Sequence, residues 1–282
     1  MKTRPPAQSG AFYADSEGAL RTQIHRCFLD PPGPGRVPSV PAERDQKLIG
    51  LIVPHAGYMY SGPVAAHSYY QLASSGPRNP IVILGPNHTG LGSGVSTMTS
   101  GEWATPLGEV KIDTDLAQKI TKNSGLIDVE EEAHRYEHSI EVQLPFLQFI
   151  YPRLFRFVPI CMMLQDLETS KEVGEAVARA TTESDAVIIA SSDWTHYEPH
   201  ERAVMKDKQA LQAALEMDPK KFQATIEEKR VSACGYGPVT ALIHASKILG
   251  AKNAQLLSYK TSGDVTGDKT TVVGYAAMTF KK

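Results

Sequence analysis

Short runs of consecutive apolar residues recur along the chain, separated by longer segments in which apolar positions follow helical spacing. An uninterrupted apolar run of this length, bounded by glycine or proline, is typical of a buried β-strand. The pattern therefore predicts strands at residues 48–53, 81–86, 154–162, 186–194, 254–262 and 270–280.

Helical spacing of the apolar residues predicts a helix between most of these strands. Because strands and helices alternate, we expect a three-layer α/β/α sandwich whose central sheet is mixed and mostly parallel. Residues 94–113 are typical of a hairpin or meander instead, which adds antiparallel strands to that sheet. The predicted helices cover residues 16–29, 61–74, 114–123, 137–149, 169–182, 202–216, 219–227 and 236–249.

The sequence suggests one domain. Its 282 residues are enough to bury a sizeable core. Residues 1–47 contain the first predicted helix and, at residues 30–47, a connection rich in proline and glycine. Neither an internal repeat nor a mid-chain linker is visible in the sequence. We therefore expect a single domain over residues 1–282, with residues 1–47 packed on it.

Composition and charge exclude several classes of function. The formal net charge is −2 and charged residues make up 21% of the chain, so a basic surface for nucleic acid or for membranes is not indicated. The apolar runs are shorter than the ~20 residues of a membrane span. The N-terminus lacks the apolar core of a signal peptide, and three cysteines without a CxxC pair argue against a disulfide framework. These features predict a cytoplasmic protein.

Three of the predicted strands end in a polar cluster that contains a histidine. His55 follows the first strand, His88 follows the second, and Asp193 and His196 lie at the end of the fourth. In open α/β sheets, ligands bind beyond the carboxyl ends of the strands, where side chains far apart in sequence converge. A single histidine after a strand is usually a turn or surface residue, but three such ends together predict a shared site.

Cys234 stands in a short turn beside Gly235 and Gly237, immediately before the helical pattern of residues 236–249. A cysteine at a helix N-terminus can have a lowered pKa and exist as a reactive or metal-binding thiolate. The alternative is that Cys234 is a small buried apolar residue that packs the turn. The pattern around this cysteine leaves both interpretations open.

Five segments carry most of the glycine, histidine and acidic residues of interest. They are PHAGYMYSGPVAAHSY (54–69), LGPNHTG (84–90), EHSIEVQLPFLQ (137–148), SSDWTHYEP (191–199) and SACGYGP (232–238). In this combination and order, over nearly the whole chain, they resemble the Memo family. Memo proteins are similar in fold to the class III extradiol dioxygenases, non-haem iron(II) enzymes that open catechol rings with two histidines and a carboxylate. The resemblance therefore implies an extradiol-dioxygenase-like fold.

The resemblance also implies that His55, His88 and Cys234 are the ligands of one metal ion. Cys234 takes the place of the dioxygenase carboxylate, and a set of two imidazoles and one thiolate is softer than the triad that suits iron(II) enzymes. Such a set fits copper or iron, with zinc possible, and the thiolate could itself be oxidised. The expected function is a copper- or iron-dependent redox or metal-handling role rather than ordinary ring cleavage.

Three further residues, His138, Asp193 and His196, match positions that line the same pocket in the Memo family, and we take them as candidate catalytic residues. His138 and His196 would donate or accept protons for an oxygen ligand or a substrate. Asp193 would orient a histidine or a bound water, as carboxylates beside metal sites often do. A small molecule or a peptide is the expected class of ligand.

A local motif offers a different metal site. HRYEH at residues 134–138 matches H-x-x-E-H, the signature of inverted zinc peptidases, in which two histidines share a helix face beside a glutamate base. We favour a solvated polar helix start at His134 and Glu137, because the strand-end set already accounts for His138. Two other functions stay open, a zinc-dependent hydrolase and a non-catalytic module that binds a peptide or small ligand.

Overall fold

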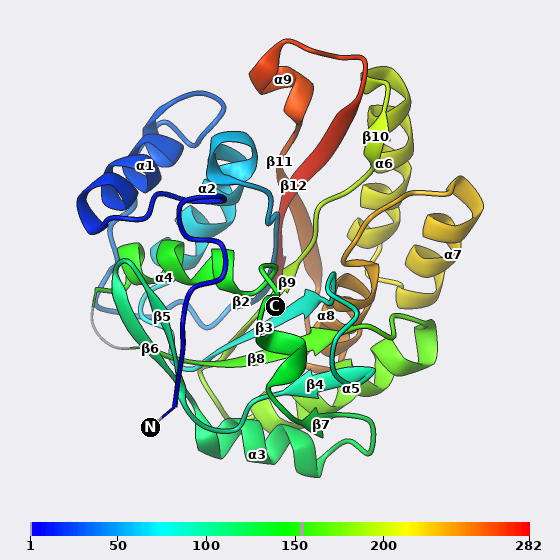
Figure 1. Ribbon diagram of the computed structural model, residues 1–282. Coiled ribbons are helices and arrows are strands. Elements are labelled where there is room, and N and C mark those ends of the chain that lie inside the picture. Colours follow the sequence, from blue (N-terminus) through cyan, green and yellow to red (C-terminus); the bar gives the residue numbers. More distant parts are fainter. Residues whose placement is uncertain (1, 153–154) are drawn as a thin grey trace.

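The computed structural model describes residues 2–152 and 155–282. Within these residues the chain forms a 12-stranded sheet with helices on both of its faces (Figure 1). Each apolar strand and each amphipathic helix has to bury a face, and stacking the helices on the two faces of the sheet buries both. The predicted three-layer α/β/α sandwich is confirmed.

Four parallel strands form the centre of the sheet. In spatial order they are β8 (Arg156–Met162), β3 (Ile81–Pro86), β9 (Val187–Ser191) and β2 (Leu48–Val53). Every residue of β2, β3 and β9 is buried, as expected for strands covered on both faces. Their carboxyl ends are level, since Val53 pairs with Ser191 and Pro86 pairs with Met162. These predicted strands are confirmed, although β9 ends at Ser191, three residues before the predicted end at Trp194. Leu154, where another of them was expected to begin, lies outside the described residues.

The other strands make the sheet mixed, as predicted. They are β12 (Val272–Lys281), β11 (Asn253–Thr261), β10 (His196–Glu198), β6 (Gly108–Ile112), β5 (Glu102–Thr105), β1 (Thr3–Arg4), β4 (Val95–Thr97) and β7 (Asp128–Val129). β12 runs antiparallel to β2 and pairs with β11 and β10. On the other side β6 lies beside β8, followed by β5 and β1. The hairpin expected at residues 94–113 is present as β5–β6, whereas β4 pairs with β8 and β7.

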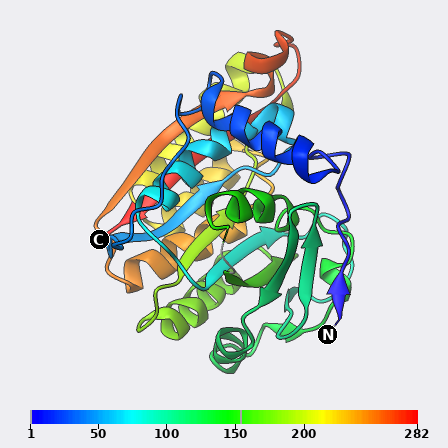
Figure 2. The ribbon, with the colours of Figure 1, turned by 90° about the vertical axis from the view of Figure 1, so that its left-hand side faces the viewer.

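Helices cover both faces of the sheet. They are α1 (Glu17–Leu29), α2 (Tyr58–Ser74), α3 (Thr114–Lys122), α4 (Leu144–Ile150), α5 (Leu167–Thr181), α6 (His200–Leu215), α7 (Pro219–Lys229), α8 (Tyr236–Ile248) and the short α9 (Ser262–Thr266). One layer contains α1, α2 and α4, and the opposite layer contains α3, α5, α7 and α8 (Figures 1 and 2). α6 packs against α7 and against β11 and β12.

The helix predicted at residues 137–149 is wrong in its first half. The structure has a short 3₁₀ helix, η2 (Glu141–Gln143), followed by α4, and no helix at residues 137–140. In this stretch the Glu137 carboxylate accepts hydrogen bonds of 2.8 Å from the backbone N–H groups of His138 and Ser139. Side-chain acceptors of this kind compete with helical hydrogen bonding, so the backbone turns here instead of coiling.

The connection at residues 30–47 contains no helix or strand and no buried residue, in agreement with the proline- and glycine-rich sequence. Across the part of the chain that the structure describes, no helix is both long enough and apolar enough to cross a membrane. The single domain over residues 1–282 stays a prediction.

Candidate metal centre

The candidate site lies beyond the carboxyl ends of the parallel strands. His55 follows the end of β2 by two residues, and His88 follows the end of β3 by two residues. Asp193 stands at the corresponding place after β9. Because these three strands are neighbours with level ends, their first loop residues meet at one edge of the sheet.

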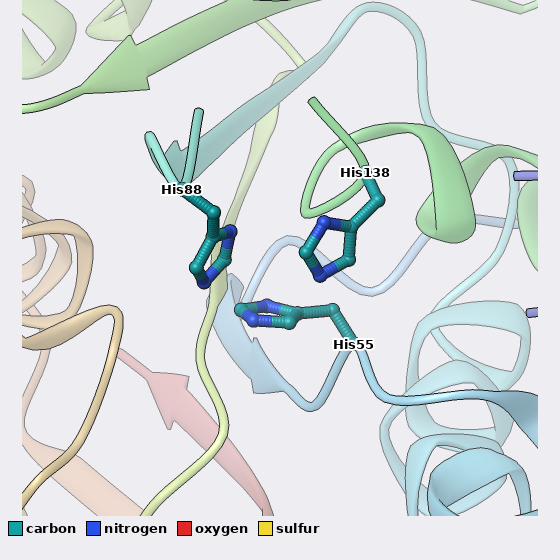
Figure 3. Close-up of side chains that lie close together, drawn as sticks. All are labelled: His55, His88 and His138. Carbon is teal, nitrogen blue, oxygen red and sulfur yellow. The ribbon is translucent and has the colours of Figure 1, made fainter. Parts of the chain in front are cut away.

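Three imidazoles converge at this edge (Figure 3). One ring nitrogen from each of His55, His88 and His138 lies within 4.8 Å of the others, close enough for all three to hold one metal ion. The ring centroids are 5.1 Å apart for His55 and His88, 5.3 Å for His55 and His138, and 4.5 Å for His88 and His138. The structure thus places His138, expected as a catalytic residue, inside the group of candidate ligands.

Cys234 lies next to this group. Its Sγ is 3.1 Å from Nε2 of His55, and the backbone N–H of Asp193 donates a hydrogen bond of 3.3 Å to the same sulfur. The side chain of Gln165 holds the turn in place, since it donates to the Cys234 carbonyl at 2.9 Å and accepts from the Gly237 N–H at 2.8 Å. A residue 179 positions away from His55 in sequence is therefore in contact with it.

The pKa of the Cys234 thiol is raised well above its usual range, first by burial and then by the charge of Asp193. This direction is opposite to the lowered pKa that its position before α8 suggested, because burial outweighs the effect of the helix N-terminus. In the metal-free protein the side chain is therefore a neutral thiol at pH 7, and it becomes a thiolate only when a cation replaces its proton.

Glu137 links two of the histidines. Its Oε1 accepts a hydrogen bond of 2.9 Å from Nδ1 of His88 and lies 3.3 Å from Nδ1 of His138. Burial would raise the pKa of Glu137, but the hydrogen bond and charge of His88, the charge of His138 and the Ser139 N–H lower it to about 2. The interpretation of Glu137 as a solvated residue is wrong, since the side chain is fully buried. Its place directly before His138, within the HRYEH motif, was the sequence signal that could have indicated this role.

His55 and His138 are neutral at pH 7. Burial, together with the charges of His88 and His138, lowers the pKa of His55 well below its usual range. Burial also lowers the pKa of His138 to about 4, although the Glu137 carboxylate acts in the opposite direction. Only a neutral imidazole has a lone pair for a metal, so the surroundings of both rings favour their use as ligands.

The two remaining candidate residues lie at the rim of this group. Oδ1 of Asp193 accepts the backbone N–H of His55 at 2.8 Å, so this carboxyl group positions the backbone at His55 rather than a histidine ring. Burial raises the pKa of Asp193 to about 6. His196 is half-buried and its Nδ1 is 2.8 Å from the carbonyl of Ser232, while its charge contributes to the lowered pKa of His55.

The peptidase-like motif does not form a second site. His134 ends the 3₁₀ helix η1 (Glu132–His134), and His138 lies beyond it in irregular backbone, so the two rings do not share a helix face. His134 is fully buried and packs edge-on against Trp103 at 5.7 Å. The expectation that His134 is a solvated residue at a helix start is therefore wrong as well.

The N-terminal segment is bonded to residues 134–141, the segment that contains His138. Arg4 in β1 forms a buried ion pair of 2.6 Å with Glu141 and donates to the backbone carbonyls of His134 (2.6 Å) and Glu137 (2.7 Å). Its guanidinium also lies over the ring of Trp103, 4.1 Å from the centroid. Two interactions of one arginine thus hold backbone carbonyls inside the motif at residues 134–138, and its ion pair with Glu141 holds the residues that follow.

Fold and site together define an α/β/α protein with a candidate metal centre at the carboxyl ends of its parallel strands. The chain belongs to the Memo-like protein family, whose model matches residues 4–279. It is 50% identical over 281 residues to a MEMO1 family protein of Methanopyrus kandleri, covering 99% of both chains. It is also 50% identical over 277 residues to one of Methanothermobacter thermautotrophicus, covering 98% of this chain and 99% of that protein. The family resemblance of the sequence is confirmed.

A solved structure supports the fold. An uncharacterized protein from Escherichia coli K12 matches with a TM-score of 0.54 and 13% sequence identity, covering 82% of this chain and 99% of that chain. At this level of identity the likeness concerns the fold alone.

Proposed function

We propose that the protein binds one transition-metal ion between His55, His88, His138 and Cys234. The observation that carries this proposal is the convergence of three imidazoles with a thiol 3.1 Å from one of them. In a tetrahedral site with Zn–N of about 2.1 Å and Zn–S of about 2.3 Å, nitrogen and sulfur ligands are about 3.6 Å apart. The separation of His55 and Cys234 is close to this value, so small side-chain movements would bring both onto one ion.

The donor set favours a soft or borderline metal. Imidazole and thiolate ligands suit copper, iron and zinc, whereas magnesium and calcium prefer oxygen. We propose copper or iron, which would supply one-electron redox chemistry, and hence a redox or metal-handling role for the protein. His196 and Asp193 would hold protons beside the ion, and Glu137 would keep the rings of His88 and His138 in orientation.

Metal analysis of protein prepared without chelator tests this proposal. We expect about one equivalent of copper or iron per chain, with reduction of copper(II) or consumption of oxygen when a reductant is added. Stoichiometric zinc with hydrolytic turnover and no response to redox state would favour the zinc hydrolase instead. A protein that binds no metal at any pH would contradict the proposal and favour the non-catalytic binding module.

Metal binding is expected to release one proton from Cys234 at pH 6.5. Because burial raises the pKa of this thiol, it is protonated in the free protein and must lose its proton to become a ligand. His55 and His138 have lowered pKa values, so they are already neutral at this pH and release none. Affinity should therefore rise by about tenfold per pH unit through the thiol.

Calorimetric titration in two buffers of different ionisation enthalpy counts this proton. The Cys234→Ser variant is the matched control, since it keeps the three imidazoles and any metal-bound water but has no thiol. We expect one proton fewer for this variant than for the wild type. An equal count in both proteins would remove Cys234 from the set of ligands while leaving the histidine site intact.

A further inference from the structure

His55 is hydrogen-bonded through its Nδ1 to Ser191, the last residue of β9. Nδ1 of His55 is 2.8 Å from the hydroxyl oxygen of Ser191, and both residues are buried. A neutral imidazole has a proton on one ring nitrogen and a lone pair on the other. The direction of this hydrogen bond therefore decides which nitrogen of His55 is free to face Cys234 and a metal ion.

The hydroxyl proton of Ser191 is donated to an acceptor other than His55. Its oxygen is 2.7 Å from the backbone carbonyl oxygen of Ser139. A carbonyl has no proton, so a contact this short between two oxygens requires the proton of the serine hydroxyl. Ser191 consequently has no proton left for His55, and the proton between Ser191 and His55 has to come from Nδ1 of the imidazole.

Gln143 completes the arrangement. Its Nε2 is 2.9 Å from the hydroxyl of Ser191 and 3.1 Å from the carbonyl oxygen of Pro54. Because a carbonyl oxygen can only accept a hydrogen bond, the amide atom next to Pro54 must be the NH₂ group, which also donates to Ser191. The Tyr69 hydroxyl donates to the other end of the amide, Oε1, at 2.5 Å. Ser191 thus donates one hydrogen bond, to Ser139, and accepts two, from Gln143 and His55, which uses its full capacity.

We infer that Ser191, aligned by Gln143 and Tyr69, fixes His55 in the tautomer that carries its proton on Nδ1 and presents the lone pair of Nε2 to the metal centre. The aligning side chains of Gln143 and Tyr69 come from η2 and α2, and both are buried, so bulk water does not compete for these hydrogen bonds. Ser191 and Gln143 are positioning residues, since they act on the metal only through His55. The part of this inference that concerns the metal rests on the proposed function.

The alternative tautomer, with its proton on Nε2, would have the sulfur of Cys234 as its hydrogen-bond acceptor. Nε2 of His55 is 3.1 Å from Sγ of Cys234, so a proton on Nε2 would point at the sulfur and block the lone pair. Without the Ser191 hydroxyl, a proton on Nδ1 would be buried with no acceptor, which is unfavourable. The Ser191→Ala variant should therefore shift His55 toward the tautomer protonated on Nε2.

Nuclear magnetic resonance of the metal-free protein with ¹⁵N-labelled histidine reads the tautomer directly. We expect the wild type to show a protonated Nδ1 and a bare Nε2 at His55, and Ser191→Ala to show the reverse. Ser191→Thr keeps the hydroxyl and should restore the wild-type pattern. Ser246→Ala, which removes a buried serine hydroxyl in α8 that has no hydrogen-bond partner, is the matched control and should leave His55 unchanged.

A wild-type protein with its proton on Nε2 would overturn the inference by itself, whether or not the variants fold. An unchanged tautomer in folded Ser191→Ala would overturn it as well. Metal titration adds a second readout, for which we expect a 10- to 100-fold loss of affinity in Ser191→Ala, about the effect of removing a side chain that orients a metal ligand, and recovery in Ser191→Thr. If the wild type binds no metal, the proposed function fails, but the tautomer measurement still decides the inference.

Discussion

The His55→Ala variant is expected to bind copper or iron at least about 100-fold more weakly than the wild type. Removing a group that only orients a ligand already costs about 10- to 100-fold in affinity. His55 supplies one of three converging imidazole nitrogens, and Cys234 lies against the same ring. Its loss would remove one nitrogen ligand of the proposed site and the ring that Cys234 contacts. Competition titration with a chelator of known affinity measures the effect.

His25→Ala is the matched control, because this histidine is exposed on α1 and belongs to no candidate site. It should bind metal as the wild type does. His134→Ala tests the peptidase-like motif directly. Wild-type affinity in His55→Ala, together with loss of binding in His134→Ala, would show that the site at the strand ends is wrong.

The Glu141→Gln variant is expected to lower the free energy of unfolding by about 3–5 kcal/mol, the usual effect of breaking a buried ion pair. The fully buried carboxylate of Glu141 pairs with Arg4 and accepts hydrogen bonds from the Tyr13 hydroxyl (2.6 Å) and the N–H groups of Ala7 (2.8 Å) and Gln8 (2.9 Å). An amide would leave the Arg4 charge uncompensated and turn NH₂ protons toward these donors. Urea unfolding followed by circular dichroism measures the change.

Glu17→Gln is the matched control for this variant. Glu17 forms an i,i+4 pair of 2.9 Å with Arg21 in α1, but the two side chains are 63% and 45% exposed. Exposed pairs of this kind contribute about 0.3–0.5 kcal/mol. Equal losses of stability in the two variants would contradict the view that the Arg4–Glu141 pair anchors the N-terminal segment to residues 134–141, the segment that contains His138.

The central strands were predictable because their signal is local. A run such as Leu48–Val53 is apolar at every position except one glycine, and a strand buried on both faces demands that pattern. The histidines that follow β2 and β3 were found for the same reason, since the end of an apolar run marks the edge of a parallel sheet. The candidate residues His55 and His88 therefore needed no knowledge of tertiary contacts.

Glu137 was missed because its burial has no local cause. The residues around it are polar, and a helix that begins at such a stretch normally exposes them to solvent. In the structure the carboxylate is covered and is hydrogen-bonded by His88, a residue 49 positions earlier in the chain. The same carboxylate also accepts hydrogen bonds from the backbone N–H groups of His138 and Ser139, which interrupt the helix predicted at residues 137–149.

The sequence by itself determined the layered α/β/α architecture, the family, and the strand-end histidines His55 and His88, because each of these follows from patterns and their order along the chain, without knowledge of which distant segments touch. Only the tertiary structure decided that the ring of His138 lies beside theirs, that Cys234 is a half-buried thiol with a raised pKa in contact with His55, and that Ser191, itself bonded to Gln143, forms a hydrogen bond with His55. These features depend on contacts between segments 48 to 179 residues apart. Burial, hydrogen-bond direction and pKa are set by such neighbours, and the chain brings them together only when it folds.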